Sequence, residues 1–123
     1  MGRILVVDDE PSLRELMRAA LEPPHDVAEA ANATEAIELW RTHDPDVVLL
    51  DVMLPGASGI DILRDVRADE TLARTRVIVV SAWDAASDRE RVEEQGIDGF
   101  ISKPFLPEEL ITMVERLLAE APP

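Results

Sequence analysis

The sequence contains no cysteine, no run near 18 consecutive apolar residues and no signal-like apolar segment at its start. Without cysteine the fold has neither disulfides nor thiolate metal sites. A membrane-spanning helix needs about 20 predominantly apolar residues, and a secretory leader needs a shorter apolar core. We therefore expect a soluble, cytoplasmic protein with no membrane association.

Aromatic residues and positive charge are also scarce. Aromatics make up 3% of the chain while apolar residues make up 46%, so the core must be mainly aliphatic. Twelve basic residues face 26 acidic ones, which gives a formal net charge of -14. Such a surface repels nucleic acid and anionic membranes, so we expect no direct nucleic-acid binding by this segment.

Lysine is almost absent. Lys103 is the only lysine, and the other eleven cationic side chains are all arginine. Arginine presents a planar fork of donors, whereas lysine is a compact point charge, so the two are not interchangeable at a site built around one ammonium. The composition alone leaves open whether Lys103 is incidental or serves such a site.

The apolar pattern predicts the fold class. A chain of 123 residues fits one compact domain. Continuously apolar runs are typical of strands that are covered on both faces of a parallel sheet. We predict strands over residues 4–7, 47–50 and 77–80, with weaker ones over residues 26–29 and 100–102.

Helical periodicity separates these runs. Pro11, Pro107 and Ser58 before Gly59 suit helix starts, and Gly96 suits a helix end. Five strands alternating with five helices predict a doubly wound α/β sandwich, with a five-stranded parallel sheet between two helical layers. Three segments each place their apolar residues on one helix face: Leu13, Leu16, Met17, Ala20 and Leu21; Ala33, Ala36, Ile37 and Trp40; Leu110, Val114, Leu117 and Leu118.

Two segments are less well defined. The helix expected over residues 84–95 has few apolar positions, so we expect it to pack weakly and to open more readily than its neighbours. The chain ends in Ala-Pro-Pro, which cannot continue a helix. We therefore predict one domain over residues 1–121, with residues 122–123 as a tail or the start of a linker.

Polar residues follow four of the predicted strands. In open α/β sheets, ligands bind beyond the carboxyl ends of the strands, so these residues are expected to converge. Carboxylates gathered in one pocket repel one another unless a cation is present, and Mg²⁺ prefers such hard oxygen ligands. The converging residues are Asp8, Asp9, Asp51, Ser81 and Lys103.

Four runs of sequence resemble the receiver domain of bacterial two-component response regulators, in order and over nearly the whole chain. They are residues 4–11 (ILVVDDEP), 51–59 (DVMLPGASG), 79–82 (VVSA) and 103–105 (KPF). The resemblance implies a flavodoxin-like, CheY-like fold and a phosphorylation-dependent signalling switch. Such a domain is not an enzyme, although it assists its own phosphoryl transfer and hydrolysis.

The resemblance also implies site residues and partners. Asp51 would accept a phosphoryl group from a sensor histidine kinase or a phosphotransfer protein, and the modified domain would regulate a downstream effector or output domain. Asp9, Asp51 and the Met53 carbonyl would hold Mg²⁺, with Asp8 binding it directly or through water. Ser81 and Lys103 would contact the phosphoryl group.

Some positions depart from the family pattern or modulate it. Phe100 stands where the family more often has a tyrosine switch residue, so a rotamer change is retained but a hydroxyl hydrogen bond is lost. Trp83 and Met53 lie at positions expected to influence the phosphoryl lifetime. For Phe100 and Trp83, plain packing is the alternative interpretation. The resemblance also suggests a cis peptide bond between Lys103 and Pro104.

Three other functions are considered. A phosphatase of the haloacid-dehalogenase type uses a second aspartate two residues after the nucleophile, where this chain has Met53. A flavodoxin-like or dinucleotide carrier needs a small, glycine-containing phosphate loop, which the acidic residues 8–11 do not provide. A pseudo-receiver that acts only as a docking module remains, and the complete set of site residues argues against it.

Overall fold

A five-stranded parallel sheet forms the centre of the protein. The computed structural model describes residues 2–54, 57–82, 90, 93–94 and 96–120. The strand order is β2-β1-β3-β6-β7, and all neighbouring strands are parallel. Their bounds are β1 (Arg3–Val7), β2 (Asp26–Ala30), β3 (Val47–Leu50), β6 (Arg76–Ser81) and β7 (Gly99–Ser102).

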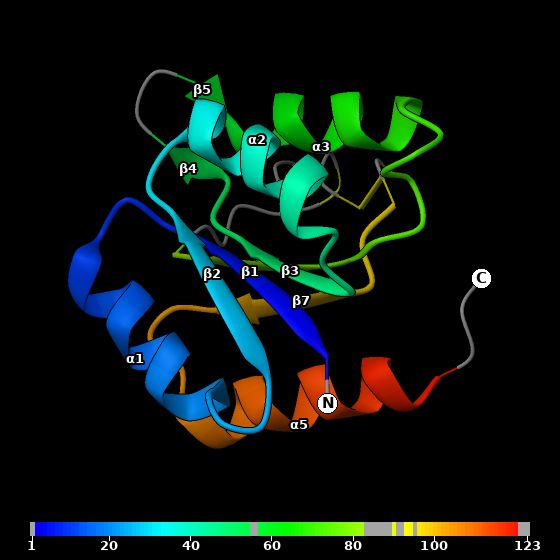
Figure 1. Cartoon of the computed structure of the whole chain (residues 1–123). Helices are drawn as coiled ribbons and strands as arrows, with labels where there is room; N and C mark the ends of the chain where they lie inside the picture. The colour runs from blue at the N-terminus through cyan, green and yellow to red at the C-terminus, as the bar shows by residue number, and fades with distance from the viewer. Residues whose placement is uncertain (1, 55–56, 83–89, 91–92, 95, 121–123) are drawn as a thin grey trace.

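Helices cover both faces of the sheet (Figure 1). Helices α1 (Pro11–Leu21) and α5 (Pro107–Ala119) lie on one face, and α2 (Ala33–His43) and α3 (Gly59–Ala68) lie on the other. Strand β1 shows why both layers are needed, because Ile4 and Val6 pack in one core cluster while Leu5 and Val7 pack in the other. Continuous apolarity along a strand thus produces two cores, as the sequence pattern predicted.

The predicted fold class is confirmed. Each predicted strand is present, and its bounds differ from the prediction by at most one residue at either end. Pro11 and Pro107 begin their helices, and α3 begins at Gly59 beside Ser58. Gly96 has a φ of 86°, the left-handed conformation that suits a helix end. Four of the five expected helices lie among the described residues, whereas the helix predicted over residues 84–95 falls largely outside them.

One detail of helix packing was predicted wrongly. Leu16 was assigned to the buried face of α1, but it is 41% exposed. The buried stripe of α1 is centred on Met17 and Leu21. Successive residues of a helix are rotated by about 100°, so position 16 lies at the edge of that stripe and faces solvent.

A short hairpin, which the sequence pattern did not predict, follows β3. Strand β4 (Met53–Leu54) pairs antiparallel with β5 (Ala57–Ser58). Gly59 follows the hairpin and lies against Val52. Only glycine fits there, because a Cβ atom would lie 2.3 Å from the Cα atom of Val52. Its N–H donates to the Val52 carbonyl at 2.9 Å, which draws the start of α3 against the segment that follows Asp51.

The strand order reverses direction at β1, the second strand of the sheet. Strand β1 is flanked by β2 on one side and β3 on the other, so the direction in which strands are added reverses there. In doubly wound folds this reversal opens a crevice beyond the carboxyl ends of the strands. No helix in the described part of the chain is long and apolar enough to cross a membrane.

Candidate functional site

Two buried carboxylates lie side by side at the carboxyl edge of the sheet. Asp8 follows β1 and Asp51 follows β3, and the pairing of Val7 with Leu50 brings the two strand ends together. The Asp51 N–H donates to the Val7 carbonyl at 3.0 Å, and the Asp8 N–H donates to the Ala30 carbonyl at 3.1 Å. Asp8 is fully buried and Asp51 is 5% exposed. Buried carboxylates need a compensating partner.

Lys103 is that partner. Its Nζ donates to Asp8 Oδ2 at 2.8 Å and to Asp51 Oδ2 at 3.0 Å. The lysine follows β7, and its backbone N–H donates to the Ser81 carbonyl at 2.9 Å. The Lys103–Pro104 peptide bond is cis, in agreement with the prediction. The single lysine is therefore built into the acidic pocket.

The protonation state of Lys103 follows from this geometry. Burial by itself lowers the pKa of the ammonium, but hydrogen bonds and negative charges from Asp8 and Asp51 outweigh burial and raise the pKa above its ordinary value of 10.5. Because the folded-state pKa is raised, the stabilisation is fully present below pH 10.5 and is lost only as the pH rises through the raised pKa. The ammonium thus remains charged at neutral pH.

The second oxygen of each buried carboxylate fixes a turn. Asp8 Oδ1 accepts the Glu10 N–H at 2.9 Å, and Asp51 Oδ1 accepts the Met53 N–H at 2.9 Å. Each carboxylate therefore uses one oxygen for its own loop and one for the lysine. Both oxygens of each carboxylate are therefore held, one by a backbone N–H and one by the Lys103 ammonium.

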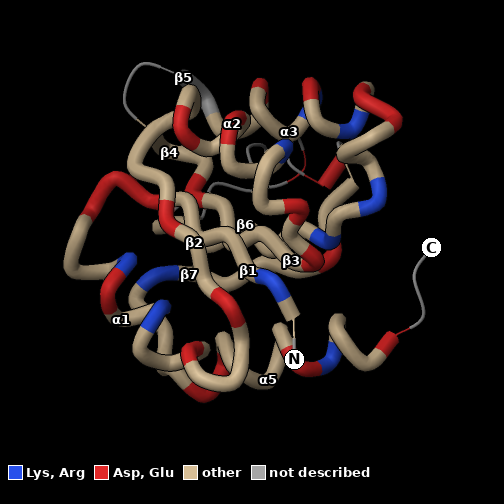
Figure 2. The backbone as a smooth tube through the Cα atoms, in the orientation of Figure 1, with Lys and Arg blue, Asp and Glu red and all other residues tan. Residues whose placement is uncertain are grey.

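Asp9 completes a cluster with the chemistry of a metal site. One carboxylate oxygen each from Asp8, Asp9 and Asp51 lies within 4.8 Å of the others, and Asp9 is exposed at the mouth. Figure 2 shows residues 8–10 as a continuous acidic stretch before α1. Three carboxylates and one ammonium leave two net negative charges, which one divalent cation would balance. This oxygen donor set fits Mg²⁺.

Ser81 lies at the same edge, whereas Phe100 lies two residues before the carboxyl end of β7. Ser81 ends β6, is fully buried and pairs in register with Ser102 of β7. Phe100 of β7 is partly buried and packs against the core cluster on the α2 and α3 side. Met53 projects a largely exposed side chain, at 58%. Trp83 lies outside the described residues.

Sequence reasoning missed Arg14. Its Nη1 donates to the main-chain carbonyl of Asp8 at 2.6 Å, and its Nε donates to Glu29 Oε1 at 3.2 Å. An arginine six residues after Asp8, on the polar side of the predicted helix, is the only sequence signal. Such a position is ordinarily solvated, so the contact becomes visible only in three dimensions.

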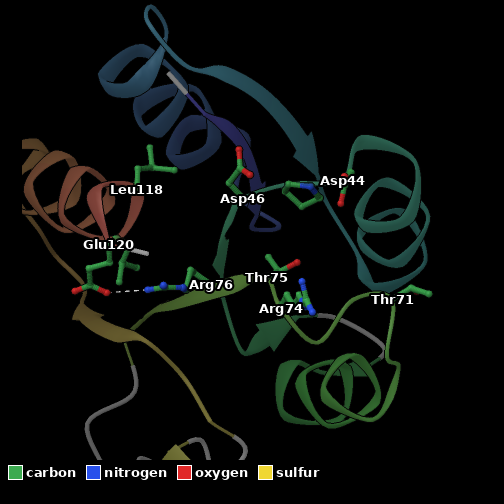
Figure 3. Close-up of a pocket in the computed structure, with 10 residues that line it drawn as sticks. Asp44, Asp46, Thr71, Arg74, Thr75, Arg76, Leu118 and Glu120 are labelled. Atoms are coloured by element: carbon green, nitrogen blue, oxygen red, sulfur yellow. Dashed lines mark hydrogen bonds and ion pairs between the residues drawn. The ribbon is translucent and has the colours of Figure 1, made fainter. Parts of the chain in front are cut away.

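A cavity of about 440 Å³ lies at the other end of the sheet (Figure 3). Acids and arginines line it together with Leu117 and Leu118, and Arg76 pairs with Glu120 at 2.8 Å. Acids and arginines there largely compensate each other. The cluster in which Lys103 bridges two buried carboxylates lies at the opposite, carboxyl edge of the sheet.

Fold and pocket together define an α/β domain with a cluster of three acids and one ammonium at the carboxyl edge of its sheet. The chain belongs to the response regulator receiver domain family, whose model matches residues 4–115. It is thus a signalling domain of two-component systems, and the resemblance seen in the sequence is confirmed. The phosphatase and cofactor-carrier alternatives receive no support.

Similar proteins span a range of regulators. The chain is 41% identical over 118 residues to the response regulator Rre1 of Synechocystis sp., a match that covers 94% of this chain and 51% of Rre1. It is 36% identical over 121 residues to the phosphate regulon transcriptional regulatory protein PhoB of Pseudomonas aeruginosa, covering 98% and 53%. The chain therefore spans about half the length of these relatives.

Solved structures agree with the fold. The BeF3-activated DrrB receiver domain superposes with a TM-score of 0.88 at 31% identity, covering 98% of this chain and 99% of that one. The phosphorylated cyanobacterial phytochrome response regulator RcpA superposes with a TM-score of 0.85 at 26% identity, covering 99% and 98%.

Proposed function

We propose that Asp51 accepts a phosphoryl group from a sensor histidine kinase or a phosphotransfer protein. The observation that carries the proposal is the Lys103 ammonium, which bridges the buried carboxylates of Asp8 and Asp51. An ammonium so placed neutralises charge where a phosphoryl group would join Asp51. The structure of phosphorylated RcpA, a relative of the same fold, supports this assignment.

The reaction requires that an anionic carboxylate approach an anionic phosphoryl group. An Asp51 oxygen forms a bond to phosphorus as the bond from phosphorus to the donor breaks, and the departing donor group carries away the electron pair. Mg²⁺, when bound, neutralises charge on the phosphoryl oxygens. Asp8, Asp9, Asp51 and the Met53 carbonyl would hold it. Lys103 contributes the second positive charge.

The phosphorylated state would be sensed by Ser81 and Lys103. Hydrogen bonds to charged groups contribute about 1.5–3 kcal/mol each. Inverting a switch from 1:99 to 99:1 needs about 5.5 kcal/mol of differential affinity, so two such contacts roughly suffice. Phe100 would respond by a rotamer change as the loop after β6 moves inward. The segment over residues 84–95, largely outside the described residues, is the element expected to shift.

The wider role follows from the relatives. PhoB is named as a transcriptional regulator and relatives from mycobacteria as DNA-binding response regulators, each about twice the length of this chain. We propose that residues 1–121 act as the receiver domain, that residues 122–123 begin a tail or linker, and that a downstream partner or output domain acts on DNA or another target. The segment itself, with its net charge of -14, would not bind DNA. We place the domain in the cytoplasm and assign it only its own phosphoryl transfer and hydrolysis.

A pseudo-receiver, which would dock partners without being phosphorylated, is the competing function. The experiment that separates the two is intact-mass spectrometry after incubation with Mg²⁺ and acetyl phosphate. We expect one phosphoryl adduct, and we expect EDTA present throughout the incubation to prevent its formation. An unmodified mass in the presence of Mg²⁺ would favour the pseudo-receiver.

Asp9→Asn is expected to weaken Mg²⁺ binding by about 10-fold or more, because it removes a carboxylate from the cation's ligand set. Asp9 is exposed, so the free energy of unfolding should change by less than about 0.5 kcal/mol. A Mg²⁺ titration followed by NMR measures the affinity. Asp61→Asn, an exposed change on α3, is the control, and equal affinity in both variants would place the metal elsewhere.

A further inference from the structure

Two neighbouring acids of the pocket, Asp8 and Asp9, are held very differently. Every polar atom of Asp8 has a partner: its carboxylate contacts Glu10 and Lys103, its N–H contacts Ala30 and its carbonyl contacts Arg14. By contrast, the Asp9 carboxylate makes no hydrogen bond or ion pair within the described ranges. Its position is therefore set by the backbone that carries it.

Arg14 controls that backbone. The Asp8 carbonyl, which accepts from Arg14 Nη1 at 2.6 Å, belongs to the peptide group that joins Asp8 to Asp9. Because a peptide group is planar, holding its carbonyl also fixes the N–Cα direction of the next residue. The Arg14 side chain is only 16% exposed, so water competes little for this contact.

Arg14 is itself held by Glu29 of β2. The Glu29 carboxylate accepts from Arg14 Nε at 3.2 Å and also from Arg18 Nη1. Arg18 is one helical turn further along α1, but its other contacts are the Val27 carbonyl on β2, at 2.7 Å, and the Glu22 carboxylate, at 3.3 Å. Two arginines thus share one acid, and only Arg14 reaches the metal-binding loop.

We propose that Arg14 is a positioning residue that holds the Asp9 carboxylate in the geometry needed for Mg²⁺. The inference rests on the proposed function, since it concerns the metal of that site. In this role the Arg14 guanidinium, itself a cation, improves the binding of Mg²⁺. Electrostatics alone gives the opposite sign, because an additional positive charge near the site repels Mg²⁺.

Positioning and charge repulsion predict opposite changes in the Mg²⁺ affinity when Arg14 is removed, so measuring that affinity distinguishes them. Arg14→Met removes the guanidinium and both of its donors while keeping an unbranched apolar stem, and Arg18→Met is the matched control from the same network. We expect Arg14→Met to raise the Kd for Mg²⁺ by about 10-fold or more, as loss of groups that orient metal ligands does. Arg18→Met should leave the Kd near the wild-type value.

The measurement is an NMR titration with Mg²⁺ alone, which follows the Asp9 and Met53 amides. Thermal unfolding without Mg²⁺ identifies any general loss of stability, which should be similar in the two arginine variants. Glu29→Gln keeps the Arg14 side chain but weakens its orientation, so a smaller increase in Kd is expected. Arg14→Lys keeps the charge without the fork and should restore the affinity only in part.

An unchanged or lower Kd in Arg14→Met, or an equal increase in Arg18→Met, would overturn the positioning role. Phosphorylation of the wild-type chain by acetyl phosphate is measured in parallel. If the wild type binds Mg²⁺ and is phosphorylated while Arg14→Met binds Mg²⁺ as tightly, only the role of Arg14 is lost. If the wild type neither binds Mg²⁺ nor is phosphorylated, the proposed function itself fails.

Discussion

Asp51→Asn is expected to abolish the phosphoryl adduct while leaving the fold intact. Asparagine has the shape of aspartate, and its amide oxygen can still accept the Met53 N–H that Asp51 Oδ1 accepts at 2.9 Å. A neutral amide, however, is not a nucleophile toward phosphorus, and it contributes no charge to a metal site. The chemistry should therefore disappear without unfolding the domain.

The comparison needs variants that remove a carboxylate elsewhere. Asp61→Asn changes an exposed acid whose ion pair among the described residues is with Arg64 of the same helix, so its adduct should equal that of the wild type. Asp9→Asn should give an adduct that forms more slowly but reaches completion as the Mg²⁺ concentration is raised. Intact-mass spectra over time distinguish the three variants, and an adduct that persists in Asp51→Asn would place the phosphoacceptor at another residue.

Lys103→Met is expected to cause the largest loss of stability among the site variants. Removing the ammonium leaves the carboxylates of Asp8 and Asp51 buried without a counter-charge. Breaking a buried ion pair from one side destabilises a protein by about 3–5 kcal/mol. We expect a value near the lower end, about 3 kcal/mol, because the pocket is open to solvent at Asp9 and cations or protons from solution can partly neutralise the two carboxylates.

Mg²⁺ should reverse part of that loss. A cation that binds only the folded state stabilises it by about 2.7 kcal/mol at 100 times its Kd. Without the competing ammonium, the pocket of Lys103→Met is more negative and should bind Mg²⁺ more tightly than the wild type does. Urea unfolding with and without Mg²⁺ measures both effects. A variant as stable as the wild type in the absence of Mg²⁺ would contradict the pairing.

Two controls separate charge from shape. Arg74→Met removes an exposed cation that makes no hydrogen bond or ion pair in the described structure, and it should change the free energy of unfolding by less than about 0.5 kcal/mol. Lys103→Arg keeps the charge, so it should recover more stability than Lys103→Met. Its planar fork does not reproduce a point charge, so phosphorylation-dependent binding of a partner should still be impaired.

Several parts of this molecule were predictable because the signal is local. Residues 47–50 are apolar throughout and β-branched or leucine, and they form the buried strand β3 with unchanged bounds. Pro11 and Pro107 begin helices because proline lacks the N–H that the first turn leaves unpaired. Asp8, Asp51 and Lys103 were predicted to converge because parallel strands end at the same edge of a sheet.

Other parts depended on rotation and on distant partners. Leu16 faces solvent because the buried stripe of α1 is centred on its neighbour, and a difference of one position decides which side a residue takes. The β4–β5 hairpin consists of two pairs of residues, too short to leave a periodic pattern. The contact of Arg14 with the Asp8 carbonyl depends on the rotation of α1, which packing against the sheet sets.

The scarcity of lysine and the absence of cysteine, together with the strand-end acids, determined from sequence alone that an oxygen-rich pocket with one ammonium would form. Tertiary structure decided how that ammonium is used. Lys103 joins residues 95 and 52 positions away and bridges both Asp8 and Asp51. Composition and periodicity describe residues that are close in the sequence. The order and register of the five parallel strands set the distances between side chains that are far apart in the sequence, and those distances bring the acids and the lysine into one site.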